Sequence, residues 1–248
     1  MSQFSRSEAL LGELSTKRFA QKNILIFGVG GVGGYVAEIL ARGGIGSLTL
    51  VDCDTVSESN LNRQIIALHS TVGQKKTAVM RQRIIDINPK ANVVCVDCFV
   101  SEQTISQFDF STFDFVVDAV DTVCAKIAII ERCVVSNIPI ISAMGAGNKL
   151  DPFRIQIADI SKTSVCPLAR VVRYELRKRG ITKGVWAAFS TEEPAVPKMS
   201  LESQDGRKSI PGSLPYLPSV MGIMIASHIL KLLNVDERGG DHCVEDRV

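Results

Sequence analysis

Short apolar runs alternate with amphipathic stretches along the first 145 residues. Five runs are dominated by apolar residues, which is typical of parallel strands buried on both faces: residues 23–30, 47–54, 92–100, 113–121 and 138–143. Stretches with helical periodicity separate them, at residues 31–44, 73–89 and 124–136. Because right-handed crossovers join parallel strands, this alternation predicts an α/β fold with a doubly wound, Rossmann-like and mostly parallel sheet.

The pattern becomes irregular after the fifth run. Residues 154–160 alternate like a half-exposed strand, 167–180 indicate an amphipathic helix, and 219–233 indicate a buried helix. Five of the nine prolines lie within residues 194–218, which predicts loops there. We expect one compact unit with four parts: a helical N-terminal arm (1–21), a Rossmann-like domain (22–145), a C-terminal half that completes the same unit (146–233) and a flexible tail (234–248).

Composition narrows the class of protein. A chain of 248 residues with 46% hydrophobic and 22% charged residues can form a globular core, and it is neither disordered nor fibrous. The N-terminus lacks the apolar segment of a signal peptide, and residues 221–233 are too short and too polar to span a bilayer. We therefore expect a cytoplasmic protein without membrane insertion, and we interpret its seven cysteines as free thiols.

Positive charge is concentrated in the second half of the chain. Residues 1–145 contain 13 basic and 14 acidic residues, whereas residues 146–233 contain 13 basic and 7 acidic residues. Such an excess attracts an anionic partner. Arg170, Arg173 and Arg177 follow the i, i+3, i+7 spacing of one helix face, so the helix expected at 167–180 presents a basic stripe. A solvated helix face is the alternative explanation of this stripe.

A glycine-rich loop follows the first predicted strand and precedes the first predicted helix of the sheet domain. It contains Gly28, Gly30, Gly31 and Gly33. Missing side chains let phosphates approach the backbone, and the helix N-terminus supplies N–H groups and partial positive charge. Asp52 lies at the end of the second predicted strand, where a carboxylate can accept hydrogen bonds from the hydroxyl groups of a ribose. The sequence therefore predicts a nucleotide-binding site within 22–145.

The next polar segments distinguish a triphosphate from a nicotinamide cofactor. Polar residues follow the second and fourth strands and begin the second helix, all at the ligand edge of an open α/β sheet: Asn60, Arg63, Gln64, Lys76 and Asp121. Arginine and lysine neutralise a triphosphate, and a carboxylate such as Asp121 can hold magnesium. Nicotinamide chemistry needs no such group of cations, so we expect ATP and Mg²⁺ here.

These segments together resemble the ubiquitin-activating-type adenylation enzymes, the ThiF/MoeB/HesA superfamily. The resemblance lies in the strings GVGGVGG, DCDTVSESNLNRQ, VGQKKT and DAVDTV. It implies that Asp52 binds the ribose and that Asp121 coordinates magnesium. It also implies phosphate contacts, and stabilisation of the attacked α-phosphoryl group, by Asn60, Arg63, Gln64 and Lys76. Such enzymes are usually homodimers in which an N-terminal arginine, here Arg6, reaches into the partner's site.

Within this superfamily, residues 4–233 are most similar to the branch that dehydrates threonylcarbamoyladenosine in tRNA. The similarity extends to FSRSEALLG, SAMGAGNKLDP, PLARVVRYELRKRG and FSTEEP. It implies that the threonyl carboxylate of the modified tRNA attacks ATP, and that an internal nucleophile then closes a ring and releases AMP. Some members have a cysteine before FSTE, where this chain has Ala187 and Ala188. A sulfur-relay partner protein is therefore left open, and DNA is not an expected partner.

Three other functions stay as alternatives. Adenylation of a ubiquitin-like sulfur-carrier protein is the first, but enzymes of that branch usually have two CxxC pairs for zinc in their second half. This chain has only Cys166 between residues 134 and 242. A non-catalytic nucleotide sensor on the same sheet is the second alternative, and an NAD-dependent oxidoreductase is the third. The basic stripe of Arg170, Arg173 and Arg177 is the candidate tRNA contact.

Overall fold

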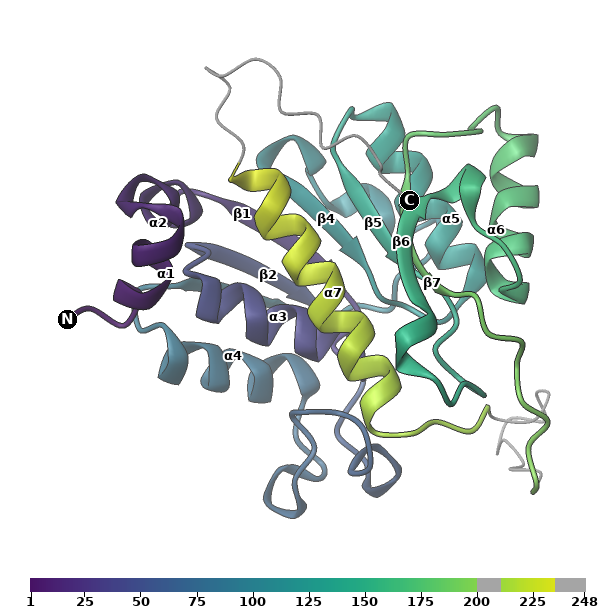
Figure 1. Cartoon of the computed structure of the whole chain (residues 1–248), viewed down its shortest axis with the longest axis horizontal. Helices are drawn as coiled ribbons and strands as arrows, with labels where there is room; N and C mark the ends of the chain where they lie inside the picture. The colour runs from purple at the N-terminus through teal and green to yellow at the C-terminus, as the bar shows by residue number, and fades with distance from the viewer. Residues whose placement is uncertain (200–210, 235–248) are drawn as a thin grey trace.

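The computed structural model describes residues 1–199 and 211–234 (Figure 1). Apart from Asn234, the tail expected at 234–248 lies outside the described residues, as does part of the proline-rich segment. Within them, a seven-stranded sheet has the order β3-β2-β1-β4-β5-β7-β6. The strands are β1 Asn23–Phe27, β2 Ser47–Val51, β3 Asn92–Val96, β4 Phe115–Asp118, β5 Ile140–Ala143, β6 Ile155–Asp159 and β7 Trp186–Ser190.

The sheet is parallel except for β6, which pairs with β7 in the antiparallel direction. This arrangement confirms the doubly wound, mostly parallel fold. The chain leaves β1 toward β2 and β3, then returns to place β4 on the other side of β1. The order of strands therefore reverses between β1 and β4, which is where an open α/β sheet forms a crevice at its carboxyl edge.

Helices cover both faces of the sheet, as the near-continuous apolar strands predict. The α-helices of the described residues are α1 Ser5–Leu11, α2 Glu13–Phe19, α3 Gly33–Gly43, α4 Lys76–Ile87, α5 Val123–Val135, α6 Pro167–Lys178 and α7 Tyr216–Leu233. Buried residues of α3, α4 and α7 pack on one face with Ile24 and Ile26 of β1. Buried residues of α5 and α6 pack on the other face with Leu25 and Phe27 (Figure 1).

Short 3₁₀ helices occupy several connections in the described part of the chain. They are Glu58–Asn60, His69–Thr71, Ile105–Gln107, Phe110–Thr112, Pro152–Arg154 and Ile160–Lys162. The first of them follows β2 and contains one of the predicted site residues, Asn60. Its N-terminus has a capping box, in which the Ser57 N–H donates to the Asn60 side-chain oxygen over 3.1 Å.

The C-terminal half is more regular than the sequence pattern indicates. Residues 186–190 form β7, a strand that the pattern did not reveal, and β7 pairs with β5 across Ser142 and Ala187. The sheet is thus continuous from β1 to the last strands of the C-terminal half. The strand interpretation of 154–160 agrees with β6. The elements expected in the first half are all present, with ends shifted by a few residues.

One helix of the described residues, α7, is long and apolar enough to cross a membrane by length and composition alone. A single such helix is weak evidence for a membrane protein, because core helices pass the same test. Here α7 packs against α3, and Met221, Ile225 and Ile229 are fully buried in the core that α3 also joins (Figure 1). The structure therefore explains its hydrophobicity by packing against the protein.

Candidate functional site

A cavity of about 730 Å³ lies at the carboxyl edge of the sheet. Segments that follow β1, β2, β4 and β5 line it, together with the start of α6 and the segment before α7. All the residues that the sequence assigned to the nucleotide, except Gly33, line this one cavity: Gly28, Gly30, Gly31, Asp52, Asn60, Arg63, Gln64, Lys76 and Asp121. Tertiary folding therefore brings together residues spread over more than 90 positions of the sequence.

The glycines of the loop have two different roles. Gly28 has φ +88° and lies so near β4 that a Cβ atom would come 2.7 Å from the Ala119 carbonyl oxygen. Gly30 and Gly31 line the cavity. Gly33 does not line it, and a Cβ atom there would lie 1.8 Å from the Gly28 carbonyl oxygen. Gly33 thus permits close packing of α3 on the loop, whereas Gly28, Gly30 and Gly31 are positioned to face a ligand.

The Asp52 carboxylate organises the loops on either side of it. One oxygen accepts a hydrogen bond from the Val29 N–H at 2.7 Å, and the other accepts from the Asp54 N–H at 2.9 Å. These bonds join the glycine loop to the end of β2. Each carboxylate oxygen has a second lone pair, so Asp52 retains acceptor capacity for ribose hydroxyl groups in the cavity.

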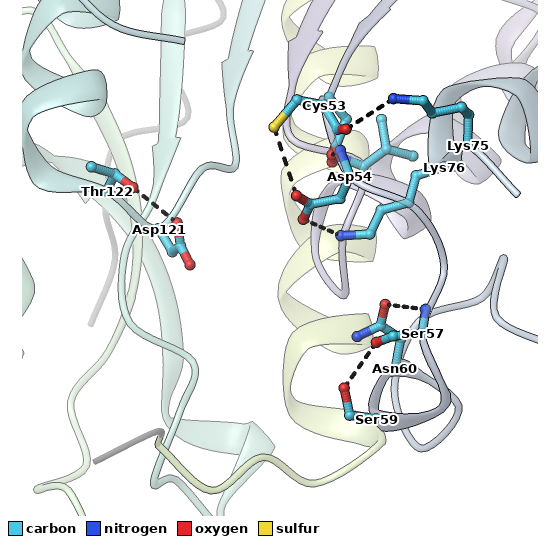
Figure 2. Close-up of polar contacts among 11 residues, drawn as sticks. Cys53, Asp54, Ser57, Ser59, Asn60, Lys75, Lys76, Asp121 and Thr122 are labelled. Carbon is cyan, nitrogen blue, oxygen red and sulfur yellow. Dashed lines mark hydrogen bonds and ion pairs between the residues drawn. The ribbon is translucent and has the colours of Figure 1, made fainter. Parts of the chain in front are cut away.

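Lys76 is held by an ion pair with Asp54. The Lys76 Nζ lies 2.7 Å from a carboxylate oxygen of Asp54, and the lysine is only 6% exposed (Figure 2). Burial raises the pKa of Asp54, but the hydrogen bond and charge of Lys76, with smaller contributions from Cys53 and Lys75, hold that pKa below its usual value. The buried ammonium group is therefore fixed at the edge of the cavity with its charge compensated.

The segment after β2 positions Arg63 and Gln64. Arg63 Nη1 donates to the Ser59 carbonyl oxygen at 2.7 Å and to the Asn62 side chain at 2.9 Å. Gln64 is buried, and its Oε1 atom has no hydrogen-bond partner among the described residues. A buried polar atom without a partner is uncommon in folded proteins, and here it belongs to a residue that lines the cavity.

Asp121 lies across the cavity from Lys76 and Asn60 (Figure 2). It is exposed, and one carboxylate oxygen accepts a hydrogen bond from the Thr122 hydroxyl at 3.2 Å. The second oxygen has no hydrogen bond or ion pair within the described part of the chain, which suits Mg²⁺, an ion usually held by one or two carboxylates and substrate phosphates. Asp52, Cys53 and Asp54 also lie close together, but both carboxylates already make hydrogen bonds or an ion pair within the protein.

A buried polar cluster beneath the cavity was not foreseen from the sequence. Lys126 of α5 lies 3.1 Å from the Asp118 carboxylate, and neither side chain is exposed. Lys126 also donates to the Ala143 carbonyl oxygen at 2.7 Å, and the Ser142 hydroxyl donates to Asp118 at 2.5 Å. The cluster joins the ends of β4 and β5, from which the segments containing Asp121 and Met144 enter the cavity. A lysine within the apolar string VCAKIAII was the available signal.

The remaining predicted residues lie outside the cavity. Arg6 is exposed on α1 and does not line the cavity of its own chain. Arg170 and Arg177 are exposed on α6, whereas Arg173 is half-buried and donates to the carbonyl oxygen and hydroxyl of Thr163. Ala187 and Ala188 are fully buried in β7. The outer two arginines of the stripe are therefore exposed on α6, but the central one, Arg173, forms hydrogen bonds within the protein.

The strand order and the crevice at the β1/β4 reversal define an α/β protein of the Rossmann-like class. The chain belongs to the ThiF family, which matches residues 4–244. It is 45% identical over 236 residues to the tRNA threonylcarbamoyladenosine dehydratase of Bacillus subtilis, covering 92% of this chain and 93% of that protein.

Two further comparisons bear on the alternatives. The structure resembles the Escherichia coli tRNA N6-threonylcarbamoyladenosine dehydratase solved in complex with ATP, with a TM-score of 0.84, 37% identity and 93% of each chain covered. The Escherichia coli molybdopterin-synthase adenylyltransferase is 34% identical over only 119 residues, which is 48% of this chain and 47% of that protein. Similarity to the dehydratases thus extends through both halves of the chain.

Proposed function

We propose that this protein is an ATP-dependent tRNA threonylcarbamoyladenosine dehydratase that works by adenylating the threonyl carboxylate of its substrate. The observation that most supports this is the cavity described above, which is lined both by the nucleotide residues of the first half and by segments of the second half. The near full-length similarity to the Bacillus subtilis and Escherichia coli dehydratases supports the choice of substrate. Because this substrate is a tRNA, we infer a cytoplasmic location.

The cavity suggests where the parts of ATP bind. The glycine loop and the N-terminus of α3 face the phosphates, and Asp52 accepts hydrogen bonds from the ribose hydroxyl groups. Asn60, Arg63, Gln64 and Lys76 contact the phosphates, with Arg63 and Lys76 providing positive charge on one side of the cavity. Asp121, on the opposite side, holds magnesium, which when bound neutralises phosphate charge.

The proposed reaction needs positioning and charge stabilisation rather than an enzymic nucleophile. A carboxylate oxygen of the threonyl group attacks the α-phosphorus of ATP, and the bond to pyrophosphate breaks. A nucleophilic atom of the same modification then attacks the activated carbonyl carbon, loses its proton and expels AMP, so the substrate has lost one water. Arg63 and Lys76 stabilise the charge that develops on the attacked phosphoryl group. This sequence requires no thiol at Ala187 or Ala188.

Pyrophosphate release tests the proposed function directly. The enzyme is incubated with ATP and one of three substrates: tRNA that contains threonylcarbamoyladenosine, the same tRNA without the modification, or a ubiquitin-like sulfur-carrier protein. Release with the modified tRNA alone, together with a loss of 18 mass units from the nucleoside, is the expected result. Release with the carrier protein alone would instead establish carrier adenylation, and no release with any substrate would indicate a non-catalytic nucleotide-binding protein.

We further propose a homodimer in which Arg6 acts in the partner's cavity. The position of Arg6 outside its own cavity is consistent with such a role. Arg6→Ala and Asp121→Ala proteins, each weakly active alone, should regain activity when mixed, because a mixed dimer contains one complete site. Activity should approach about one quarter of wild type if subunits exchange at random. Absence of recovery, once subunit exchange is demonstrated by mass spectrometry, would rule out a role in trans.

We propose tRNA contact through the exposed arginines of α6. Arg170 and Arg177 make no ion pair or side-chain hydrogen bond within the described residues, whereas Arg173 is engaged with Thr163. An Arg170→Gln/Arg177→Gln protein should therefore bind tRNA more weakly. The slope of the logarithm of its binding constant against the logarithm of salt concentration should be shallower by about 0.7–0.9 for each lost phosphate contact. The KM for ATP should not change. Unaltered tRNA affinity and salt slope would show that this helix face is only solvated.

A further inference from the structure

Three lysines of the described residues are buried, and they differ in how their charge is compensated. Lys76, Lys126 and Lys149 are 6%, 0% and 3% exposed, respectively. Lys76 pairs with Asp54 and Lys126 pairs with Asp118. Lys149 has no carboxylate oxygen within 4.0 Å of its Nζ atom in the part of the chain that the structure describes. A buried ammonium group without a carboxylate partner is unusual, because removing a charge from water costs free energy that a partner normally offsets.

The Glu192 carboxylate is engaged with backbone N–H groups instead of with Lys149. Lys149 Nζ donates to the backbone carbonyl oxygen of Glu192. The Glu192 carboxylate instead accepts hydrogen bonds of 3.0 Å from the backbone N–H groups of Leu150 and Asp151. Burial lowers the pKa of Lys149, and the negative charges of Glu192 and Glu193 oppose that shift only in part. The ammonium group has three N–H donors, of which one is used by Glu192.

Lys149 also lines the cavity that contains the nucleotide residues. It belongs to the segment after β5, whereas Arg63 and Lys76 belong to segments between β2 and β3. In the strand order, β4 and β1 separate these two regions, and Asp121 follows β4. The cavity thus has two cationic regions: one proposed above for the phosphates, and one at Lys149.

We propose that Lys149 binds the carboxylate of the threonyl group and thereby presents that carboxylate to the α-phosphorus of ATP. This inference rests on the proposed function, in which a carboxylate must enter the cavity beside ATP. The carboxylate supplies the negative partner that Lys149 lacks among the described residues, through a charge-assisted hydrogen bond from an N–H donor of the ammonium group. One oxygen held by Lys149 leaves the other oxygen available for attack. Lys149 is then the group that selects the free acid over neutral analogues.

Inhibition by free nucleosides tests this assignment. The probes are threonylcarbamoyladenosine nucleoside and its carboxyl methyl ester, which differ by one negative charge, each added as an inhibitor of tRNA dehydration. The wild-type enzyme should bind the acid about tenfold to a hundredfold more tightly than the ester. Lys149→Met should bind acid and ester equally, and Lys149→Arg should retain part of the preference. Lys162→Met, a change at an exposed lysine outside the cavity, should behave like wild type.

The readouts separate this role from the other roles that Lys149 could have. The KM for modified tRNA should rise about tenfold or more in Lys149→Met, while the affinity for ATP stays within about twofold of wild type. An equal loss of ATP affinity would assign Lys149 to the phosphates and overturn the proposal. A lowered melting temperature with an unchanged acid-to-ester preference would also overturn it, because Lys149 would then be only structural. Wild-type enzyme inactive on modified tRNA would refute the proposed function itself.

Discussion

Arg63→Ala and Asp121→Ala should each lower the rate of adenylation by about 10²–10³-fold. The two side chains line the same cavity, and the proposed mechanism uses the positive charge of Arg63 for the phosphates and the carboxylate of Asp121 for magnesium. Each substitution removes an interaction with the charge that develops on the phosphoryl group. The loss of activity should therefore appear in kcat more than in the KM for tRNA. Single-turnover formation of AMP from radiolabelled ATP measures the effect.

Matched controls make this result interpretable. Arg81→Ala removes an exposed arginine of α4 that does not line the cavity, and it should leave the rate unchanged. Circular dichroism and melting temperature should be close to wild type for Arg63→Ala and Asp121→Ala. Asp121 is exposed, and the hydrogen bonds of Arg63 among the described residues are to its own loop. Near-wild-type turnover in either folded variant would remove that residue from the mechanism.

Lys126→Met should be the most destabilising single substitution considered for this chain. It leaves the fully buried Asp118 carboxylate without its cation, and breaking one partner of a buried ion pair costs about 3–5 kcal/mol. It also leaves the Ala143 carbonyl oxygen without the hydrogen bond from Lys126. Urea unfolding, followed by tryptophan fluorescence of Trp186, measures the change in the free energy of unfolding.

A paired variant separates the buried charge from the loss of packing. Asp118→Asn/Lys126→Met removes both charges, and it should recover a large part of the stability lost in Lys126→Met. The midpoint of urea unfolding should therefore be higher for the paired variant than for Lys126→Met. If the paired variant is as unstable as Lys126→Met, the uncompensated charge of Asp118 is not the cause of the destabilisation.

Local sequence pattern was sufficient for most of the strands and for the glycine loop. The nearly apolar runs predicted five strands that the structure contains, because strands buried on both faces need apolar residues at nearly every position. The edge strand β3 is the exception, since most of its residues are exposed although its run is also apolar. The missed strand, β7, has Ala187 and Ala188 at its centre, and alanine has little preference for strands. Its position depends on pairing with β5 and β6, partners distant in sequence.

The candidate site was predictable as a set of residue types but not as a network of contacts. The positions of Asp52, Asn60, Arg63, Gln64, Lys76 and Asp121 along the chain indicated a triphosphate, because the carboxyl ends of parallel strands meet at one edge. Their partners were not predictable. The Arg173 contact with Thr163 and the Lys126 contact with Asp118 depend on side-chain geometry that spacing along one helix does not define.

The sequence by itself determined the α/β class, the turn at the glycine loop after β1 and the polar residues that follow β2 and β4. These features follow from local periodicity and from the steric freedom of glycine. Only the tertiary structure decided which buried charges are compensated. The sequence does not distinguish the three buried lysines. Among the described residues, Lys76 and Lys126 have a carboxylate partner, whereas Lys149 does not. Pairing between residues far apart in the chain is set by packing, and packing places Lys149 in the cavity.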